Sequence, residues 1–352
     1  MVRTTLRTMG VGGEATPTRP SRAVDPDRPA TRTQLLRHLT AEHIASITAL
    51  VAAAQDADAV SPLSEHVLLH LQGAADTTDT GVQHVLRRLA ADSNGPLDAA
   101  DGSLVGYAYL DTGDVVEGSS TELVVHPDHR GSGHGRALVT AVIEAAPDHQ
   151  PRLWAHGAHP AAADLAAAMG FRRVRALWQL RAGLVDLPAP KFPHDVHVRT
   201  FVVGQDEHEW LALNTRAFSA HPEQGGWSLA DLRARMAAPW FDPAGFFLAE
   251  RAGRLVGFHW TKVHGATDQP GQQHPHPPIG EVYVVGVDPD AQGGGLGRAL
   301  TLVGLHHLRE RALDQAMLYV EEDNAAALGV YSSLGFTHWD TDVVYRRVPD
   351  QR

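Results

Sequence analysis

The chain has 352 residues, a formal net charge of −11 and no cysteine. This length suits two domains of about 150 residues better than a single core. The acidic balance, with no basic run beyond scattered arginines in the N-terminal tail, argues against a nucleic-acid partner. Without cysteine, disulfides, Cys-ligated metals and a thiolate nucleophile are excluded, so any acyl transfer has to be direct.

No segment is expected to enter a membrane. No apolar stretch approaches the roughly 20 residues that a membrane helix requires, and the N-terminus lacks the apolar core of a signal peptide. We therefore expect a soluble, cytoplasmic monomer with no membrane partner. Residues 1–33 mix Arg, Pro, Thr and Gly without periodicity, which predicts a disordered tail.

Hydrophobic periodicity predicts a first domain over residues 34–183. Its first helix begins near Thr40, a plausible N-cap. The other predicted elements are a helix over 65–71, strands over 103–110 and 122–125, a helix over 136–146, a strand over 153–155, a helix over 161–169 and a strand over 174–181.

Residues 184–196 are rich in proline, which stiffens the backbone, and are predicted to be a linker. The second domain, residues 197–352, repeats the order of the first. One of its helices starts at Ser228, where Asp231 completes a capping box. The other predicted elements are a helix over 206–218, strands over 246–250, 254–262 and 281–287, a helix over 298–311, a strand over 317–321, a helix over 324–333 and a strand over 337–348.

A glycine-rich signature occurs twice. In the second half, the strand that begins at Glu281 leads into Gln292-Gly-Gly-Gly-Leu-Gly-Arg298 and then a helix. In the first half, Thr121-Glu-Leu-Val-Val-His-Pro leads into Arg130-Gly-Ser-Gly-His-Gly-Arg136. When Pro289 is aligned on Pro127, Gly295 falls on Gly133.

Such glycines let the backbone approach an anion, and the following helix points its N–H groups and dipole at it. Each half is therefore predicted to bind a pyrophosphate. A Walker loop is excluded because Gly-Lys-Ser/Thr is absent, and a dinucleotide fold lacks its acidic residue. For Arg136 and Arg298, a solvated helix N-terminus explains the residue nearly as well as a phosphate contact.

Leu318-Tyr-Val-Glu, Asn324, Tyr331 and Leu334-Gly-Phe336 follow the second glycine loop. With these segments the second half resembles the GNAT superfamily of N-acetyltransferases, and the first half resembles it in weaker form. The resemblance implies an α/β (α+β) fold of two tandem GNAT domains. Each would have a mixed, mostly antiparallel sheet with a splayed parallel strand pair and flanking helices.

The resemblance also implies acetyl-CoA as cosubstrate, with pantetheine on the splayed strand and pyrophosphate on the glycine loop. The cofactor positions implied in the second domain are Val285, Gly286, Val287, Gln292, Gly293, Gly294, Gly295, Leu296, Gly297, Arg298, Asn324, Ala325, Ala326, Ala327, Leu328 and Gly329. Those implied in the first domain are Leu123, Val124, Val125, Gly131, Ser132, Gly133, His134, Gly135 and Arg136.

Attack of an amine on a thioester requires a proton acceptor and a donor for the departing thiolate. Glu281 begins the strand that is expected to splay. A partly buried carboxylate has the raised proton affinity that suits a general base. Tyr331 matches the GNAT tyrosine that acts as general acid. A salt-bridged carboxylate and a core aromatic remain alternative interpretations of the two residues.

The first copy lacks the corresponding polar residues. Aligning Phe336 on Phe171 places Ala166 at the position of Tyr331 and His159 at that of Asn324. The first domain is therefore predicted to bind acetyl-CoA without turning it over.

Six further segments resemble the mycothiol synthase family of tandem GNAT enzymes. They are Thr121-Glu-Leu-Val-Val-His-Pro, Trp154-Ala-His-Gly, His221-Pro-Glu-Gln-Gly-Gly-Trp227, Ala238-Pro-Trp-Phe-Asp-Pro, Gly257-Phe-His-Trp-Thr-Lys262 and Gly280-Glu-Val-Tyr-Val-Val-Gly-Val. This resemblance implies acetylation of the cysteine α-amine of cysteinyl-glucosaminyl-inositol. The substrate positions that it implies are Glu65, Glu223, Lys262, Glu281 and Tyr319. Because Glu65 lies in the first domain, the acceptor would occupy a groove between domains.

Two other functions remain open. The chain could be a GNAT that acts on another small amine, such as an aminoglycoside, a polyamine or a protein N-terminus. It could also be a non-catalytic module that senses acetyl-CoA. No metal is expected, because His264, His274 and His276 lie in a Pro-rich, irregular segment without the i, i+4 spacing of a helical site.

Overall fold

The computed structural model describes residues 30–73, 81–90, 102–113, 118–219, 221–264 and 278–347, so residues 1–29 of the predicted tail lie outside it. The helices are α1 Ala41–Asp58, α2 Glu65–Gly73, α3 His134–Ala145, α4 Pro160–Ala168, α5 Glu207–Ala217, α6 Pro222–Gly225, α7 Leu229–Met236, α8 Leu296–Glu310 and α9 Ala325–Ser333. The strands are β1 Thr31–Leu36, β2 Val82–Leu89, β3 Leu104–Asp111, β4 Ser120–Val125, β5 Arg152–Ala155, β6 Phe171–Gly183, β7 Val196–Thr200, β8 Phe246–Arg251, β9 Arg254–His264, β10 Ile279–Val287, β11 Gln315–Glu321 and β12 Thr337–Arg347.

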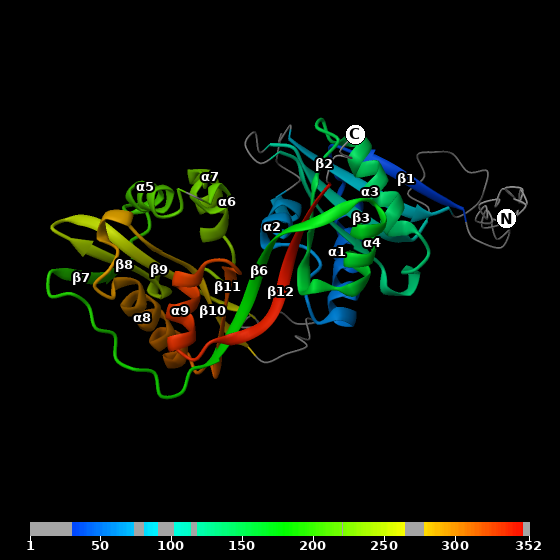
Figure 1. The fold of residues 1–352 in the computed structure, drawn as a ribbon. Helices are drawn as coiled ribbons and strands as arrows, with labels where there is room; N and C mark the ends of the chain where they lie inside the picture. The colour runs from blue at the N-terminus through cyan, green and yellow to red at the C-terminus, as the bar shows by residue number, and fades with distance from the viewer. Residues whose placement is uncertain are drawn as a thin grey trace, which may run out of the picture.

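Within the described residues, all the strands belong to one sheet in the order β1-β2-β3-β4-β5-β12-β6-β11-β10-β9-β8-β7. Most neighbours are antiparallel; β4 and β5 form one parallel pair, and β10 and β11 form the other. One core cluster packs α1 and α2 on the first half of the sheet, and another packs α8 and α9 on the second half. Figure 1 shows the long strands β6 and β12 running side by side between the two halves.

Strand β12 joins the two halves by insertion. Its residues Val343 to Tyr345 pair with β5, and its other edge pairs with β6 along almost its whole length. The far edge of β6 then pairs with β11 of the second half. The predicted boundary at residues 183 and 184 therefore does not separate two sheets. A strand inside a sheet needs a hydrogen-bonded partner at each edge, and β6 and β12 each have their partners in the other half of the chain.

The local signals of the repeat are present in both halves. Gly133 and Gly295 are the N-caps of α3 and α8, with φ of 82° and 81°, a left-handed conformation that glycine adopts without strain. His159 and Asn324 cap α4 and α9 by accepting hydrogen bonds from the backbone N–H two and three residues on, at 3.1 and 3.0 Å. The alignment of the two copies is therefore confirmed at the level of local structure.

Three strands were not predicted. β1, β2 and β7 lie toward the two outer ends of the sheet, and residues 31–33 of β1 had been assigned to the disordered tail. Thr31 pairs with Leu89 and Leu36 with His84. The pairing partner that orders this segment is far along the chain, so no local pattern marks it. The capping box of Ser228 and Asp231 is present as predicted.

Among the described residues, no helix combines the length and the apolar character needed to cross a membrane.

Candidate active sites

Each half contains a parallel strand pair that splays apart. β10 pairs with β11 only at Gly280 and Glu281, and β4 pairs with β5 only from Ser120 to Glu122. Beyond these points the edges of Val285–Val287 and Leu123–Val125 that face the neighbouring parallel strand pair with no strand in the described part of the chain. Unpaired backbone groups of this kind can hydrogen-bond an extended ligand.

The glycine loop of the second half fits a pyrophosphate. Gly293, Gly294 and Gly295 have φ of 90°, 58° and 81°, and a Cβ added at any of them would meet no other atom within 4 Å. The loop is thus open on the side where each Cβ would stand, and it leads directly into α8. Backbone N–H groups at such a helix start favour an anion.

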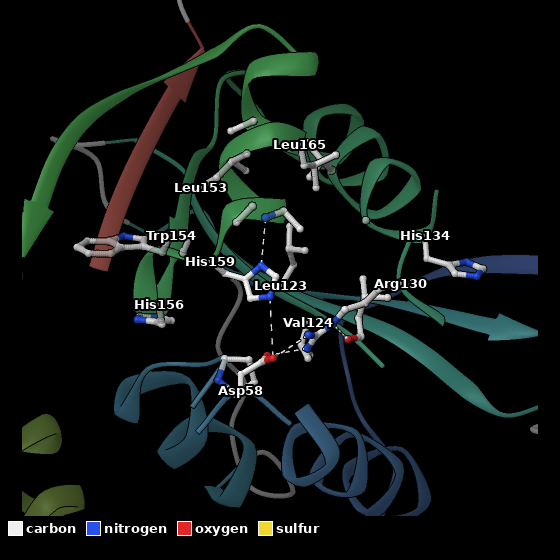
Figure 2. Close-up of a pocket in the computed structure, with 18 of the residues that line it drawn as sticks. Asp58, Leu123, Val124, Arg130, His134, Leu153, Trp154, His156, His159 and Leu165 are labelled. Atoms are coloured by element: carbon white, nitrogen blue, oxygen red, sulfur yellow. Dashed lines mark hydrogen bonds and ion pairs between the residues drawn. The ribbon is translucent and has the colours of Figure 1, made fainter. Parts of the chain in front are cut away.

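The corresponding site of the first half contains a cavity of about 380 Å³, lined by the β4 splay, the loop 130–136 and α4. Ala166 lines it where the second copy has Tyr331. Arg130 donates two hydrogen bonds of 2.7 Å to Asp58, and His159 Nε2 lies 4.0 Å from the same carboxylate. Figure 2 shows the side chains of Arg130 and His159 both directed at the carboxylate of Asp58.

Glu281 is 6% exposed and lies at the last residue pair before the second splay. Its Oε2 is 2.7 Å from Nε2 of His264. Burial alone would raise the pKa of Glu281, but the hydrogen bond and charge of His264, together with the charge of Lys262, outweigh it and hold the pKa below its ordinary value. The raised proton affinity that we expected for this carboxylate is therefore wrong.

Tyr331 lies on α9 and is 8% exposed. Its ring centroid lies 5.8 Å from that of Phe336. It belongs to the core cluster that contains Val282, the residue after Glu281. Because strand residues alternate between faces, Glu281 and the core cluster that contains Tyr331 lie on opposite faces of the sheet. Burial raises the pKa of Tyr331 to about 12, so the phenol stays protonated near neutral pH.

Two of the predicted substrate residues are in contact although they come from different halves. Lys262 on β9, only 8% exposed, forms an ion pair with Glu65 at the start of α2. Its Nζ lies 4.7 Å from the ring centroid of Trp240 and 5.3 Å from that of Tyr283. Lys262 pairs in register with Glu281, so Glu65, Lys262 and Glu281 form one cluster between the halves.

The remaining predicted substrate residues are placed less tightly. Tyr319 on β11 is 41% exposed, and the phenol oxygen accepts a hydrogen bond of 2.7 Å from Gln179. Glu223 belongs to α6, but its side chain lies outside the described residues.

Sequence reasoning missed a cationic and aromatic patch beside Lys262. Arg235 Nε donates to the Tyr283 hydroxyl at 2.8 Å, and the guanidinium lies 3.8 Å from the Trp227 ring centroid. Burial, the largest cause, raises the pKa of Tyr283 well above its ordinary value. Trp227, Trp240 and Tyr283 stand in segments that carried the family resemblance, so this was the available signal.

A second missed cluster lies at the first splay. Glu122 is the last residue paired with β5, and it accepts hydrogen bonds from Ser64 N at 2.5 Å and Ser64 Oγ at 2.6 Å. His156 lies between two carboxylates, with Nε2 at 3.3 Å from Glu122 and Nδ1 at 3.0 Å from Asp342.

These contacts fix the charges of the cluster. Burial would lower the pKa of His156, but the bonds and charges of Asp342 and Glu122 outweigh it and raise the pKa to about 10. Burial would raise the pKa of Glu122, yet His156 and Ser64 hold it below its ordinary value. Glu122, His156 and Asp342 are thus a buried ionic cluster that joins β4 to β12.

The described residues contain no group of three or more His, Asp or Glu side chains arranged to hold a metal ion. His264 instead contacts Glu281, while His274 and His276 lie outside the described residues.

The comparisons with known proteins agree with this geometry. The Acetyltransferase (GNAT) family model matches residues 208–336, and the Acetyltransferase (GNAT) domain model matches residues 97–173. A tandem GNAT protein from the clavulanic acid biosynthesis pathway has a TM-score of 0.64 at 19% identity, with 90% of this chain and 98% of that chain covered. A GCN5-related N-acetyltransferase from Sphaerobacter thermophilus has a TM-score of 0.60 at 23% identity, covering 91% and 96%. Two splayed sites on this fold define a tandem GNAT protein.

Curated relatives specify the family further. The mycothiol acetyltransferase of Thermobispora bispora is 54% identical, covering 86% of this chain and 95% of that protein. Those of Streptomyces coelicolor and Streptosporangium roseum are 49% and 47% identical, covering 92% and 88% of this chain and 97% of each relative. The chain belongs to the mycothiol acetyltransferase family.

The ionic cluster predicts how stability depends on pH. The folded pKa of His156, about 10, lies above its ordinary value of 6.5, so its stabilising contribution is complete below pH 6.5 and is lost as the pH rises toward 10. Across this window the slope is about 1.4 kcal/mol per pH unit for one proton. We expect urea unfolding to show this loss, and His156→Gln to be less stable at pH 7 and to lack the slope. Equal slopes for both proteins would contradict a charged His156.

Proposed function

We propose that the C-terminal domain transfers the acetyl group of acetyl-CoA to the cysteine α-amine of cysteinyl-glucosaminyl-inositol, which gives mycothiol. Family membership at about half identity over most of the chain supports the reaction. The observation that carries the assignment to this domain is Glu281 at the second splay, with Tyr331 in the core cluster on the opposite face of the sheet. The first domain has Ala166 in place of the tyrosine.

Acetyl-CoA supplies the activated acetyl group. Val285–Val287 would hold the pantetheine, Gln292–Arg298 the pyrophosphate, and Asn324–Gly329 the far side of the cosubstrate. Asn324 already serves as the N-cap of α9, so its contribution there is to fix the start of that helix. The splayed backbone of β10 offers N–H groups that can stabilise the oxyanion formed on attack.

The two ionisable residues then divide the proton transfers. Glu281, ionised at neutral pH because its pKa is lowered, accepts the proton of the α-ammonium directly or through a water. His264 contacts Glu281 and is 30% exposed, so it can pass that proton toward solvent. Tyr331, whose pKa is about 12, carries the proton that the departing thiolate requires.

The acceptor side is formed by residues of both halves. Glu65 and Lys262 meet between the halves, and Tyr319 lies one strand beyond Glu281 on the same face. Charged groups hydrogen-bond hydroxyls strongly, which suits an acceptor with a sugar and an inositol. We propose Glu65, Glu223, Lys262, Glu281 and Tyr319 as its binding residues.

The acceptor assignment is tested by a substrate panel. Initial rates of CoA release would be measured with cysteinyl-glucosaminyl-inositol, aminoglycosides, polyamines and free cysteine. We expect kcat/KM for the conjugate to exceed that of every other amine by at least about 100-fold, since several hydroxyl contacts are lost in the others. Activity on other amines alone would retain the acetyltransferase and discard the acceptor. Binding of acetyl-CoA with no turnover of any amine would favour a sensor.

The base assignment predicts a pH effect of His264→Asn. The substitution removes the hydrogen bond and the charge of His264, the two largest causes that lower the pKa of Glu281. The effect of burial, which raises that pKa, should then dominate. Glu281 acts as a base only when ionised, and therefore the acidic limb of kcat/KM should move to higher pH, by on the order of one unit. Tyr331→Phe is the matched control and should lower kcat roughly 100-fold without moving the limb. Coincident limbs for wild type and His264→Asn would argue against Glu281 as base.

We also propose that the N-terminal cavity binds acetyl-CoA through Leu123–Val125 and Gly131–Arg136 without turning it over. Gly131 and Gly293 are counterparts with φ of 70° and 90°, and neither has an atom within 4 Å of an added Cβ. Aspartate tolerates a left-handed conformation and would repel a phosphate. The two positions therefore allow a matched comparison of the two sites.

Calorimetric titration with CoA should give two sites per chain for the wild type and one for each of Gly131→Asp and Gly293→Asp. Only Gly293→Asp should lose turnover, and Gly131→Asn should keep both sites because it adds no charge. A single site in the wild type that Gly131→Asp leaves intact would contradict binding in the first domain.

A further inference from the structure

We propose that Arg181 on β6 is a further acceptor-binding residue, which hydrogen-bonds hydroxyls of the sugar and inositol part of the acceptor. This inference rests on the proposed function. It assigns a specificity role to a strand that the N-terminal half supplies to the sheet of the C-terminal half.

The position of Arg181 follows from the register of the sheet. Lys262 pairs with Glu281, Glu281 with Met317 and Met317 with Arg181. Side chains of directly paired residues lie on the same face, and neighbouring strands are about 4.8 Å apart. Arg181 is therefore two strands, about 10 Å, from Glu281 on the acceptor face. An acceptor of three linked units whose amine lies at Glu281 can extend this far.

The opposite face is occupied. Leu180 and Ala182, the neighbours of Arg181 in the chain, pack in the core cluster of α8 and α9. Arg181 is thus held away from that core. Its surroundings on the acceptor face include Tyr319 and Asp340, which are close enough to act on its charge.

The guanidinium is oriented but not neutralised. It lies 4.1 Å from the ring centroid of Trp339, and its Nε donates to Gln179 Oε1 at 3.1 Å. Among the described residues the guanidinium forms no ion pair with a carboxylate. Burial is the largest cause of the lowered pKa of Arg181. A guanidinium has five N–H donors, so the two terminal nitrogens keep donors for a ligand hydroxyl.

The neighbouring groups extend this arrangement. Gln179 is buried and donates to the Tyr319 hydroxyl at 2.7 Å, so Arg181, Gln179 and Tyr319 form one hydrogen-bonded chain across β6 and β11. Trp339 is 62% exposed and Tyr319 41%. A large exposed aromatic surface next to fixed donors is typical of a ligand-binding surface. Because the donors are already held in place, little entropy is lost when a hydroxylated ring binds.

The test compares Arg181→Met on two acceptors, the full conjugate and cysteinamide, which lacks the sugar and inositol. For the conjugate we expect KM to rise roughly 10-fold to 100-fold, the cost of one or two hydrogen bonds to a charged donor, with kcat and the KM for acetyl-CoA nearly unchanged. For cysteinamide we expect no change in kcat/KM. Arg181→Lys, which keeps the charge without the planar fork, should have an intermediate KM.

Matched variants separate this role from a structural one. Arg172→Met, at an exposed position on the same strand, should leave every parameter unchanged. Trp339→Leu should raise the KM for the conjugate, and the double variant should be less impaired than the product of the two single effects, because both act on one guanidinium.

The outcomes distinguish the two proposals. If the wild type does not acetylate the conjugate, the proposed function fails. If it does and Arg181→Met keeps the wild-type KM, the role of Arg181 is overturned. An equal loss on the conjugate and on cysteinamide would also overturn it, because such a loss indicates a structural defect rather than a lost hydroxyl contact.

Discussion

The insertion of β12 between β5 and β6 is the constraint on which the rest of the structure depends. A strand interior to a sheet leaves backbone N–H and C=O groups unsatisfied unless both edges are paired. β5 meets this requirement with β12, the last described strand of the chain, and β6 meets it with β12 and β11. The two halves therefore share one sheet, and the face that carries Lys262 and Glu281 continues to Arg181 on β6. This continuity places residues of the first half on the face of the sheet to which we assign the acceptor.

The two splays differ in the electrostatics of one buried carboxylate. Glu122 and Glu281 both lie at the last pair before a splay, and both have a lowered pKa because a histidine contacts them. The histidine at Glu122 is His156, held on its other side by Asp342, so its proton cannot leave without breaking a buried ion pair. The histidine at Glu281 is His264, whose side chain is 30% exposed. The two carboxylates therefore differ in their surroundings, since one contacts a histidine enclosed by a second carboxylate and the other contacts a partly exposed histidine, and this difference supports the proposal that only the second half is catalytic.

Features that depend on neighbouring residues in the chain could be predicted from the sequence. The glycine caps at Gly133 and Gly295, the capping box of Ser228 and the counterpart positions His159 and Asn324 all follow from local rules. What could not be predicted depends on pairing between distant segments. β1 is ordered by β2, and His156 bridges Glu122 and Asp342 only because β12 returns to the first half. The sign of the pKa shift at Glu281 was wrong for the same reason, since burial could be inferred from the sequence and the contact with His264 could not.

If the first copy is non-catalytic, as we propose, it still has a structural role. Its α2 supplies Glu65 to Lys262, and its β6 separates β12 from β11 and carries Gln179 and Arg181 toward Tyr319. Ala166, which stands where the second copy has Tyr331, is a buried residue of α4 that lines the first cavity, so its identity does not affect these contacts. Loss of the strand or helix would remove part of the proposed acceptor site of the other half. Under this proposal, selection on one reaction retains the fold of both copies while it retains the chemistry of one.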